Sequence, residues 1–452
     1  MHPGPAVLSM PKEPPLAERP ANGGSSFLRG RVRHTDPEAL EPLACEGLDS
    51  FRHWQDDVRW QELEDGHHKT MNQHFASTAL ISPSNAERTV ARLLSLIDVE
   101  IGGSRDWDVT VHDARVFQRV LAKGSLGVGE AYMDGWWDAP RVDQLIARLL
   151  VSDLPTKVTH DLPLLISVIR GHLFNLQRFR PYEVGQKHYD TGNDLFRLML
   201  DSRMIYSCAY WKDAEDLEQA QEAKLDLICR KLGLRPGMRL LDIGSGWGGL
   251  LKFAAERYGI EGVGITVSRE QAQYANANSD GLPIETRLMD YMDLTGRFDR
   301  IVSVGMFEHV GQKNYPAFFR KVRQLLEPDG LFLLHTIGGN ISTVHGDPWL
   351  EKYIFPNGML PSPRQIAQSI ERLFVLEDWH NFGPDYDRTL MAWLERFDTA
   401  WPQLQGRYDD RFRRMWRYYL SVCAAVFRVR SCQLWQLVLS PNGVPGGYTS
   451  VR

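Results

Sequence analysis

The sequence predicts an α/β fold, in which a small, mainly helical domain precedes a doubly wound, mostly parallel seven-stranded sheet. A short apolar run ends in a glycine-rich turn at residues 239–249, as the first strand of such a sheet does. From Val184 onward, apolar runs of strand length alternate with segments of helical periodicity. This alternation indicates parallel strands joined by crossover helices. Between Ser84 and Arg180 the periodicity is mainly helical.

The expected strands are short apolar runs bounded by polar or glycine-rich turns. They fall at residues 239–243, 261–267, 284–289, 298–304, 330–336, about 373–379 and 433–439. The helices between them are expected at about residues 217–232, 250–258, 269–278, 314–326, 364–371, 387–402 and 410–427. Right-handed crossovers would place these helices on both faces of the sheet.

Three regions are expected along the chain. Residues 1–80 are rich in Pro, Gly, Glu and Arg and weakly periodic, so they are expected to form a flexible extension, with His67, His68 and His74 solvated. Residues 81–180 should form the small domain and residues 181–452 the domain that carries the chemistry. Within the small domain we expect helices at 86–97, 113–122 and 142–150, a short β segment at 101–111 and an aromatic, glycine-rich loop at 124–138.

Composition excludes several classes of protein. The net charge of −5 gives no general attraction to nucleic acid. The five cysteines lack a C-x-x-C spacing, which argues against structural zinc or a disulfide framework and fits a reducing cytosol. The first residues lack the regions of a signal peptide, and no run reaches the ~18 apolar residues of a membrane span. We therefore expect a soluble protein, or one that rests on a membrane surface, with no metal.

The glycine turn, Asp242-Ile-Gly-Ser-Gly-Trp-Gly-Gly249, satisfies two cofactor patterns. Its glycines fit the dinucleotide fingerprint, which also requires an acidic residue at the end of the second strand, roughly 20 residues on. Thr266 stands there instead. An acid directly before the glycines is typical of S-adenosylmethionine-dependent methyltransferases. Asp242, Gly244 and Gly246 are therefore expected to line a site for S-adenosylmethionine.

Polar side chains follow the next strands in turn. Thr266 and Gln271 can reach ribose hydroxyls, Asp290 can accept a hydrogen bond from an adenine amino group, and Tyr291 can stack on the base. Ligands of such sheets bind outside the carboxyl ends of the strands, where these residues are expected.

Two further residues end the fourth and fifth expected strands beside the cofactor. Glu308 follows Val304 in Gly305-Met-Phe-Glu-His309, and His335 directly follows the apolar run 331–334. A Glu and His pair can act as a general acid and base. The alternative is that the two side chains brace the loops through hydrogen bonds.

Several segments together resemble the cyclopropane-fatty-acyl-phospholipid synthase family. They are His188-Tyr-Asp190, Gly192-Asn-Asp194, Tyr206-Ser-Cys-Ala-Tyr-Trp211, Leu241–Gly249, Val304-Gly-Met-Phe-Glu-His-Val-Gly311, Leu334-His-Thr-Ile-Gly338, Tyr353–Gly358, Trp379-His-Asn-Phe-Gly383, Asp385-Tyr-Asp387 and Trp393-Leu-Glu-Arg-Phe397. The similarity runs from about residue 111 to 439 and includes the string 124–137 of the small domain, which favours the phospholipid-acting branch.

This resemblance implies a methyltransferase-type fold that transfers a methylene group from S-adenosylmethionine to a cis double bond of a phospholipid acyl chain, with bicarbonate as the base. It implies that the bicarbonate cage consists of Cys208, Glu308, His335, Ile337 through its backbone, and Tyr386. The cofactor residues that it implies are Tyr206, Ser207, Gly244, Gly246, Thr266, Gln271, Asp290, Tyr291 and Val304. Cys423 matches a candidate thiol of the family, but its apolar helical surroundings favour a packing role.

Other interpretations remain open from the sequence. A relative on the same fold could stop at a methyl branch or methylate an amine, and a protein without catalytic activity could bind lipid. The expected partner is an unsaturated phospholipid at the cytoplasmic face of a membrane, which the basic stretch 170–187 and the loop 124–137 would contact transiently. The arginine-rich segment 410–419 would either rest on a bilayer or be solvated over an apolar face. A homodimer would gain from joint docking, although nothing in the sequence requires one.

Overall fold

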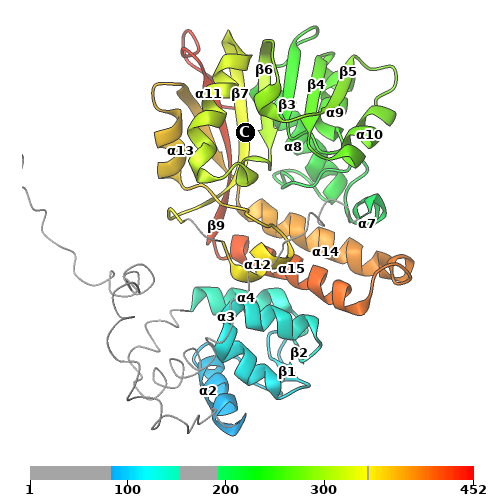
Figure 1. The fold of residues 1–452 in the computed structure, drawn as a ribbon, viewed down its shortest axis with the longest axis vertical. Coiled ribbons are helices and arrows are strands. Elements are labelled where there is room, and N and C mark those ends of the chain that lie inside the picture. Colours follow the sequence, from blue (N-terminus) through cyan, green and yellow to red (C-terminus); the bar gives the residue numbers. More distant parts are fainter. Residues whose placement is uncertain (1–82, 153–191, 344–345) are drawn as a thin grey trace, which may run out of the picture. The chain divides into compact units, whose positions relative to one another are not determined.

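The computed structural model describes residues 83–152, 192–343 and 346–452 (Figure 1). These ranges belong to one compact unit, Thr78–Arg452. The predicted extension 1–80 with its three histidines lies outside the described residues, and so does the basic stretch 170–187.

A seven-stranded sheet joins residues 239–440, as the sequence predicts. Its strands are β3 (Arg239–Ile243), β4 (Glu261–Thr266), β5 (Ile284–Leu288), β6 (Phe298–Val304), β7 (Leu326–Gly339), β8 (Val375–Asn381) and β9 (Cys432–Ser440). They lie in the order β5-β4-β3-β6-β7-β9-β8. Neighbouring strands are parallel, except that β9 is antiparallel to both β7 and β8. The mostly parallel, doubly wound sheet is therefore confirmed.

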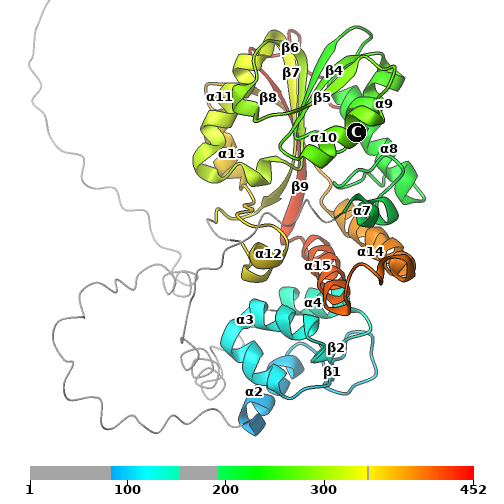
Figure 2. The ribbon, with the colours of Figure 1, turned by 45° about the vertical axis from the view of Figure 1, so that its right-hand side comes forward.

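Helices cover both faces of this sheet. They are α8 (Leu217–Lys231), α9 (Gly249–Tyr258), α10 (Arg269–Ala277), α11 (Tyr315–Leu325) and α13 (Pro363–Ile370). Figures 1 and 2 show α11 and α13 on one face and α8, α9 and α10 on the other. Consecutive strand residues point to opposite faces. Accordingly, Leu240 packs in the cluster that includes α8 and α9, whereas Leu241 packs with α11 and α13. Burial on both faces explains why the central strands β3 and β9 are largely apolar, whereas the outer strands β5 and β8 carry more polar residues and are more exposed.

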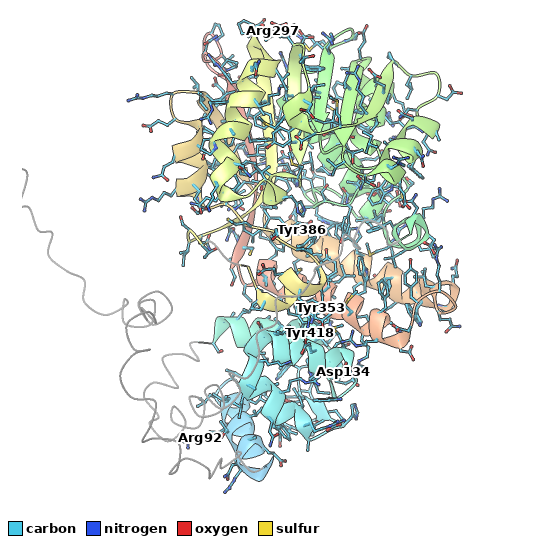
Figure 3. The ribbon with its side chains drawn as sticks, in the orientation of Figure 1. Arg92, Asp134, Arg297, Tyr353, Tyr386 and Tyr418 are labelled. Carbon is cyan, nitrogen blue, oxygen red and sulfur yellow. The ribbon has the colours of Figure 1, made fainter. Side chains whose placement is uncertain are left out.

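Two long helices, α14 (Pro384–Leu404) and α15 (Asp410–Arg428), lie beyond the carboxyl ends of the parallel strands. Figure 3 shows this directly, because Arg297, which precedes β6, lies at the opposite end of the sheet from Tyr386 on α14. The helices α3 (Arg115–Met133) and α4 (Val142–Val151) pack against α15 in a shared hydrophobic core.

Most of the arginines of α15 form ion pairs. Arg411 Nε lies 3.1 Å from a carboxylate oxygen of Asp134, which follows α3, and Arg414 lies 2.7 Å from Asp138. Arg417 pairs with an aspartate of α14 at 2.6 Å. The helix buries its apolar side in the core. These contacts support the solvated-arginine interpretation of segment 410–419 over the bilayer interpretation.

The predicted loop at residues 124–138 is wrong. Helix α3 runs through it to Met133 with a kink at Gly124, and only residues 134–136 form a turn before the short strand β2 (Trp137–Asp138). The glycines allow close packing rather than a loop. A Cβ atom at Gly129 would lie 2.4 Å from the indole ring of Trp349. Packing of the helix therefore outweighs the cost of about 1 kcal/mol that glycine carries in a helix.

The other differences concern short elements and boundaries. The expected β segment 101–111 shrinks to an isolated bridge and the strand β1 (Thr110–Val111), which pairs with β2. Helix α2 spans Pro83–Ser95. The sequence did not predict α7 (Asn193–Met199), α12 (Pro348–Tyr353) or the short 3₁₀ turns η1 (Tyr291–Asp293), η2 (Phe307–His309) and η3 (Gln312–Asn314). Within the described ranges, no helix is both long and apolar enough to cross a bilayer.

Candidate active site

A cavity of about 420 Å³ opens at the carboxyl ends of the parallel strands. Every residue predicted to bind the cofactor lines it: Tyr206, Ser207, Asp242, Gly244, Gly246, Thr266, Gln271, Asp290, Tyr291 and Val304. These residues come from the segment before α8 and from the ends of β3, β4, β5 and β6. We call this hollow the cofactor cavity.

The glycine turn forms its floor after β3. Gly244 adopts a φ of 83°, a left-handed conformation that glycine tolerates better than any other residue. A Cβ atom at this position would also lie 2.7 Å from the side chain of Met306. The turn therefore requires glycine both for its backbone conformation and for the space that it leaves in the cavity.

The polar residues after β4 and β5 are held in fixed positions. The hydroxyl of Thr266 donates to Gln271 Oε1 at 2.8 Å, and Thr266 Oγ1 accepts from the backbone N–H of Ser268 at 3.1 Å. Asp290 accepts from the N–H of Met292 at 2.8 Å and so begins the turn η1 that carries Tyr291. The protein's own hydrogen bonds thus fix both walls.

Sequence analysis missed a buried lysine of this cavity. Lys224 on α8 is 1% exposed and its ammonium donates to Ser207 Oγ at 2.8 Å. Lys224 falls on the inward stripe of α8 with Leu217, Gln221 and Ile228, all of which are buried. The sequence does carry a signal of this burial, because Lys224 occupies a position of the helical pattern where an apolar residue is expected.

A second group of predicted residues, which we call the cage, lies beside the cofactor cavity. Glu308 follows β6 in the turn η2, and its Oε1 accepts from the backbone N–H of Ile337 on β7 at 2.7 Å. Burial raises the pKa of Glu308 to about 7, although the hydrogen bond from Ile337 acts in the opposite direction. The cage thus holds a carboxyl group that can exchange a proton near neutral pH.

His335 of the cage is held by a strand neighbour. The side-chain nitrogen of Gln436, which lies opposite His335 on β9, lies 3.2 Å from His335 Nδ1. An amide nitrogen only donates, so Nδ1 accepts and Nε2 carries the ring proton. Burial, reinforced by the charges of Lys224 and Lys231, lowers the pKa of His335 well below its usual range. The ring is therefore neutral at pH 7 and presents an Nε2–H donor.

The three remaining cage residues lie in one apolar cluster. Cys208, Ile337 and Tyr386 pack together with Phe382. The same Phe382 contacts the ring of His335, with centroids 5.9 Å apart. Burial raises the pKa of Tyr386 well above its usual range, so its phenol stays protonated. The fold thus brings the five cage residues together from four separate segments.

Two polar atoms of the cage are buried without a hydrogen-bond partner among the described residues. They are Oε2 of Glu308 and Nε2 of His335. A buried polar atom without a partner costs about 1–3 kcal/mol. One acceptor and one donor are therefore available to a small polar ligand.

Cys423 lies on α15 with its side chain packed against the shared core. Burial raises the pKa of its thiol above the ordinary range. A nucleophilic thiol needs a lowered pKa, so these surroundings support the packing role.

Comparison with known proteins places the chain among enzymes that act on lipids. The family described as mycolic acid cyclopropane synthetase matches residues 177–437. The cyclopropane-fatty-acyl-phospholipid synthase of Escherichia coli (strain K12) is 52% identical over 373 residues, which cover 82% of this chain and 97% of that protein. Tuberculostearic acid methyltransferase UfaA1 of Mycobacterium tuberculosis (strain H37Rv) is 33% identical over 349 residues, or 73% of this chain and 82% of that protein.

The fold resembles a solved structure of the same family. The crystal structure of the mycolic acid cyclopropane synthase CmaA1 complexed with SAH and CTAB aligns with a TM-score of 0.53 and 34% identity. The alignment covers 58% of this chain and 99% of that chain. The chain therefore belongs to the mycolic acid cyclopropane synthetase family and is an enzyme of the methyltransferase class.

Proposed function

We propose that this enzyme transfers a methylene group from S-adenosylmethionine to the cis double bond of an unsaturated acyl chain in a membrane phospholipid, and so closes a cyclopropane ring. The observation that carries this proposal is the cage: Glu308 and His335 hold buried, unpartnered polar atoms next to the cofactor cavity. The relative that is 52% identical is named for this activity.

The cofactor cavity suits S-adenosylmethionine, which supplies an electrophilic methyl group when bound. The glycine turn leaves space for a ligand against the backbone, and the polar groups of Thr266, Gln271 and Asp290 line the wall away from it. An alkene is a weak nucleophile, so the enzyme must hold it close to the methyl group and in line with it. The solved relative that carries SAH, the product of methyl transfer, supports this assignment.

The surroundings of the cage suit the chemistry that follows. Methylation of an alkene leaves a carbocation, which water would quench, so the site must exclude water. Phe382 and Leu434 are buried in the cluster that holds Cys208, Ile337 and Tyr386. The cage is therefore lined by apolar groups around a few polar atoms.

The polar atoms of the cage fit bicarbonate, which when bound would supply the base for the proton lost from the new methyl group. Glu308 Oε2 would accept the O–H of the ion, and His335 Nε2 and the hydroxyl of Tyr386 would donate to its other oxygens. A shared proton lets two acidic groups occupy one pocket, where two bare negative charges would repel each other. The unpartnered acceptor and donor support this fit.

A phospholipid substrate requires the enzyme to dock at a membrane, and we place this step at the cytoplasmic face. We assign membrane contact to the region 81–180 and the chemistry to the region 181–452. The loop 124–137, which sequence analysis offered for docking, is largely helical and partly buried. The other predicted docking element, the stretch 170–187, lies outside the described residues.

A methyl-branching enzyme is the second candidate, and the relative named tuberculostearic acid methyltransferase favours it. The two activities differ in whether a ring closes after methyl transfer. Amine methylation has no such support, and a lipid-binding role without catalysis would not require polar groups buried at a cost in stability.

The test is product analysis after incubation of the purified full chain with S-adenosylmethionine, bicarbonate and vesicles of cis-monounsaturated phosphatidylethanolamine. We expect mass spectrometry to show a gain of one CH₂ and proton NMR to show loss of the olefinic signals. A gain of CH₂ with a double bond retained would establish the branching enzyme instead. Vesicles of the saturated lipid serve as the matched control, and unchanged unsaturated lipid would overturn the proposal.

A further inference from the structure

A row of polar side chains crosses the strands β7, β9 and β8 and leads away from the cage. Gln436 on β9 lies opposite His335 on β7 and opposite His380 on β8. Paired residues of neighbouring antiparallel strands point to the same face of a sheet. The ring of Phe382 contacts both histidines, with its centroid 5.9 Å from that of His335 and 4.9 Å from that of His380. The three polar side chains therefore lie side by side on one face.

A buried lysine of α8 stands at the far end of this row. Lys231 is fully buried, and its ammonium nitrogen lies 3.1 Å from Nδ1 of His380. A second partner is the carboxylate of Asp378, at 3.6 Å, which also pairs with Arg452 at 2.6 Å. Burial lowers the pKa of Lys231 to about 7, although the charge of Asp378 acts in the opposite direction. Lys231 belongs neither to the lining of the cofactor cavity nor to the cage.

The charge of Lys231 gives the row a direction. An ammonium group has donors and no acceptor, so Nδ1 of His380 must accept, and the ring proton of His380 then lies on Nε2. Burial, reinforced by the charge of Lys231, lowers the pKa of His380 to about 4, so the ring is neutral at pH 6. His380 therefore has one donor to offer and no acceptor left.

Gln436 has the complementary requirement. Its side-chain nitrogen lies 3.2 Å from Nδ1 of His335, and its Oε1 is buried without a partner among the described residues. A buried acceptor without a partner costs about 1–3 kcal/mol. The Nε2–H of His380 is a donor in the same row. A hydrogen bond between the two groups, direct or through one water, would orient the amide so that its N–H points to His335.

We propose that Lys231, His380 and Gln436 form a chain of directed hydrogen bonds that holds the ring proton of His335 on Nε2, where it faces the cage. Each member donates to the next, from the ammonium of Lys231 to the ring of His335. Lys231 and His380 are positioning residues, because they act through His335. The inference deepens the proposed function, on which it rests for the identity of the ion that the Nε2–H would meet.

The test sets hydrogen bonding against packing at His380. In His380→Gln, the amide oxygen can accept from Lys231 and the amide nitrogen can donate to Gln436, so the order of donors is kept. His380→Phe keeps a ring beside Tyr210 and Phe382 but loses both the donor and the acceptor. A chain of hydrogen bonds predicts that only the glutamine variant keeps the wild-type state of His335. A packing role predicts that only the phenylalanine variant does.

Nitrogen-15 NMR of the full chain, labelled at histidine, reports the ring proton of His335 directly. Among the 14 histidines, the signals of His335 are identified by their loss in His335→Gln. At pH 6 we expect the wild type and His380→Gln to show the Nε2–H tautomer. In His380→Phe the ratio of the Nδ1–H to the Nε2–H tautomer should rise about 3- to 10-fold, which is the equivalent of one hydrogen bond.

Lys231→Met tests the start of the chain. It should raise the same tautomer ratio about 3- to 10-fold, although Lys231 bonds to His380 and not to His335. Lys252→Met, which removes a partly exposed lysine of α9 beside Glu256, is the matched control and should leave the ratio unchanged. If Lys231→Met does not fold, the two His380 variants carry the test.

The outcomes decide the inference separately from the proposed function. A wild-type His335 in His380→Gln, with a raised tautomer ratio in His380→Phe, establishes the chain of hydrogen bonds. The chain is overturned if the wild type carries the proton on Nδ1, if His380→Phe keeps the wild-type ratio, or if His380→Gln disturbs His335 as strongly as His380→Phe does. The NMR measurement needs neither substrate nor bicarbonate, so its result does not depend on the product analysis.

Discussion

The cofactor cavity and the cage lie side by side but satisfy their polar groups differently. In the cavity, Thr266 bonds to Gln271 and Asp290 bonds to a backbone N–H, although Oδ1 of Asp242 is buried without a partner among the described residues. In the cage, Glu308 and His335 each keep a buried atom without a partner among the described residues. Hydrogen bonds within the protein therefore fix the polar wall after β4 and β5, whereas the cage leaves both an acceptor and a donor for a polar ligand. Changes in the cavity should act on cofactor affinity, and changes in the cage should act on turnover.

Glu308→Gln should give the largest effect and is the sharpest way to break this comparison. The amide keeps an acceptor for Ile337 but cannot take up a proton, so we expect turnover to fall about 100-fold or more. The affinity for S-adenosylhomocysteine should stay within about twofold, because Glu308 does not line the cavity. Product formation and calorimetry measure the two quantities. Glu261→Gln, at an exposed position that begins β4, is the matched control. An equal loss of affinity and turnover would contradict the separation of the two regions.

Gly244→Ala tests the comparison from the other side. The alanine would need a φ of 83° and would place Cβ 2.7 Å from Met306, inside the turn that lines the cavity. The left-handed conformation alone costs about 1–2 kcal/mol. We expect the affinity for S-adenosylhomocysteine to fall about 10-fold or more, and turnover at saturating S-adenosylmethionine to fall much less. Gly406→Ala, where nothing lies within 4 Å of the new Cβ, should leave both unchanged.

A change away from both regions should alter stability alone. Gly129→Ala places a methyl group 2.4 Å from the indole ring of Trp349, so α3 and α12 must move apart. Overpacking of this kind costs about 1–3 kcal/mol. Thermal unfolding should show a lower Tm for this variant, while its affinity for S-adenosylhomocysteine stays that of the wild type. A fall in affinity would mean that the cavity depends on this distant helix contact.

The smallest predicted effect is a pH dependence of stability. The pKa of Glu308 is raised by burial from an ordinary 4.5 to about 7, so folding favours the protonated form. This contribution is fully present below pH 4.5 and is lost as the pH rises through 7. Between pH 6 and 8 the wild type should therefore lose about 1 kcal/mol of unfolding free energy relative to Glu308→Gln. Urea unfolding at both pH values measures this difference, and parallel curves would show that Glu308 is already ionised in the folded protein.

The centre of the sheet was predictable because its strands are buried on both faces. Largely apolar runs such as residues 240–243 predict parallel strands. The polar residues that follow these runs lie at the edge of the sheet where ligands bind. Most residues that line the cofactor cavity lie at these strand ends. Short sequence motifs therefore predicted most of the cofactor residues. The prediction of a loop in place of the second half of α3 was wrong, because the sequence does not reveal that Gly129 packs against a tryptophan more than 200 residues away.

The cage was harder to predict from the residues alone. Glu308 and His335 are strand-end residues, but Tyr386 and Cys208 reach the cage only through the packing of α14 and the segment before α8. The supporting residues left weak signals. Lys224 and Gln436 are polar residues inside apolar patterns, which indicate burial without naming a partner. The partners become visible only when the strand register places Gln436 opposite His335.

The position of β9 has a consequence for the order in which the enzyme matures during synthesis. Residues 432–440 leave the ribosome after every other described strand, and they insert between β7 and β8. Until then β7 has an open edge, which is a site for aggregation. His335 also lacks the Gln436 side chain that fixes its proton on Nε2. A nascent chain that has completed β3, β4, β5 and β6 already carries the strand ends of the cofactor cavity, but the cage is complete only when the last strand closes the sheet.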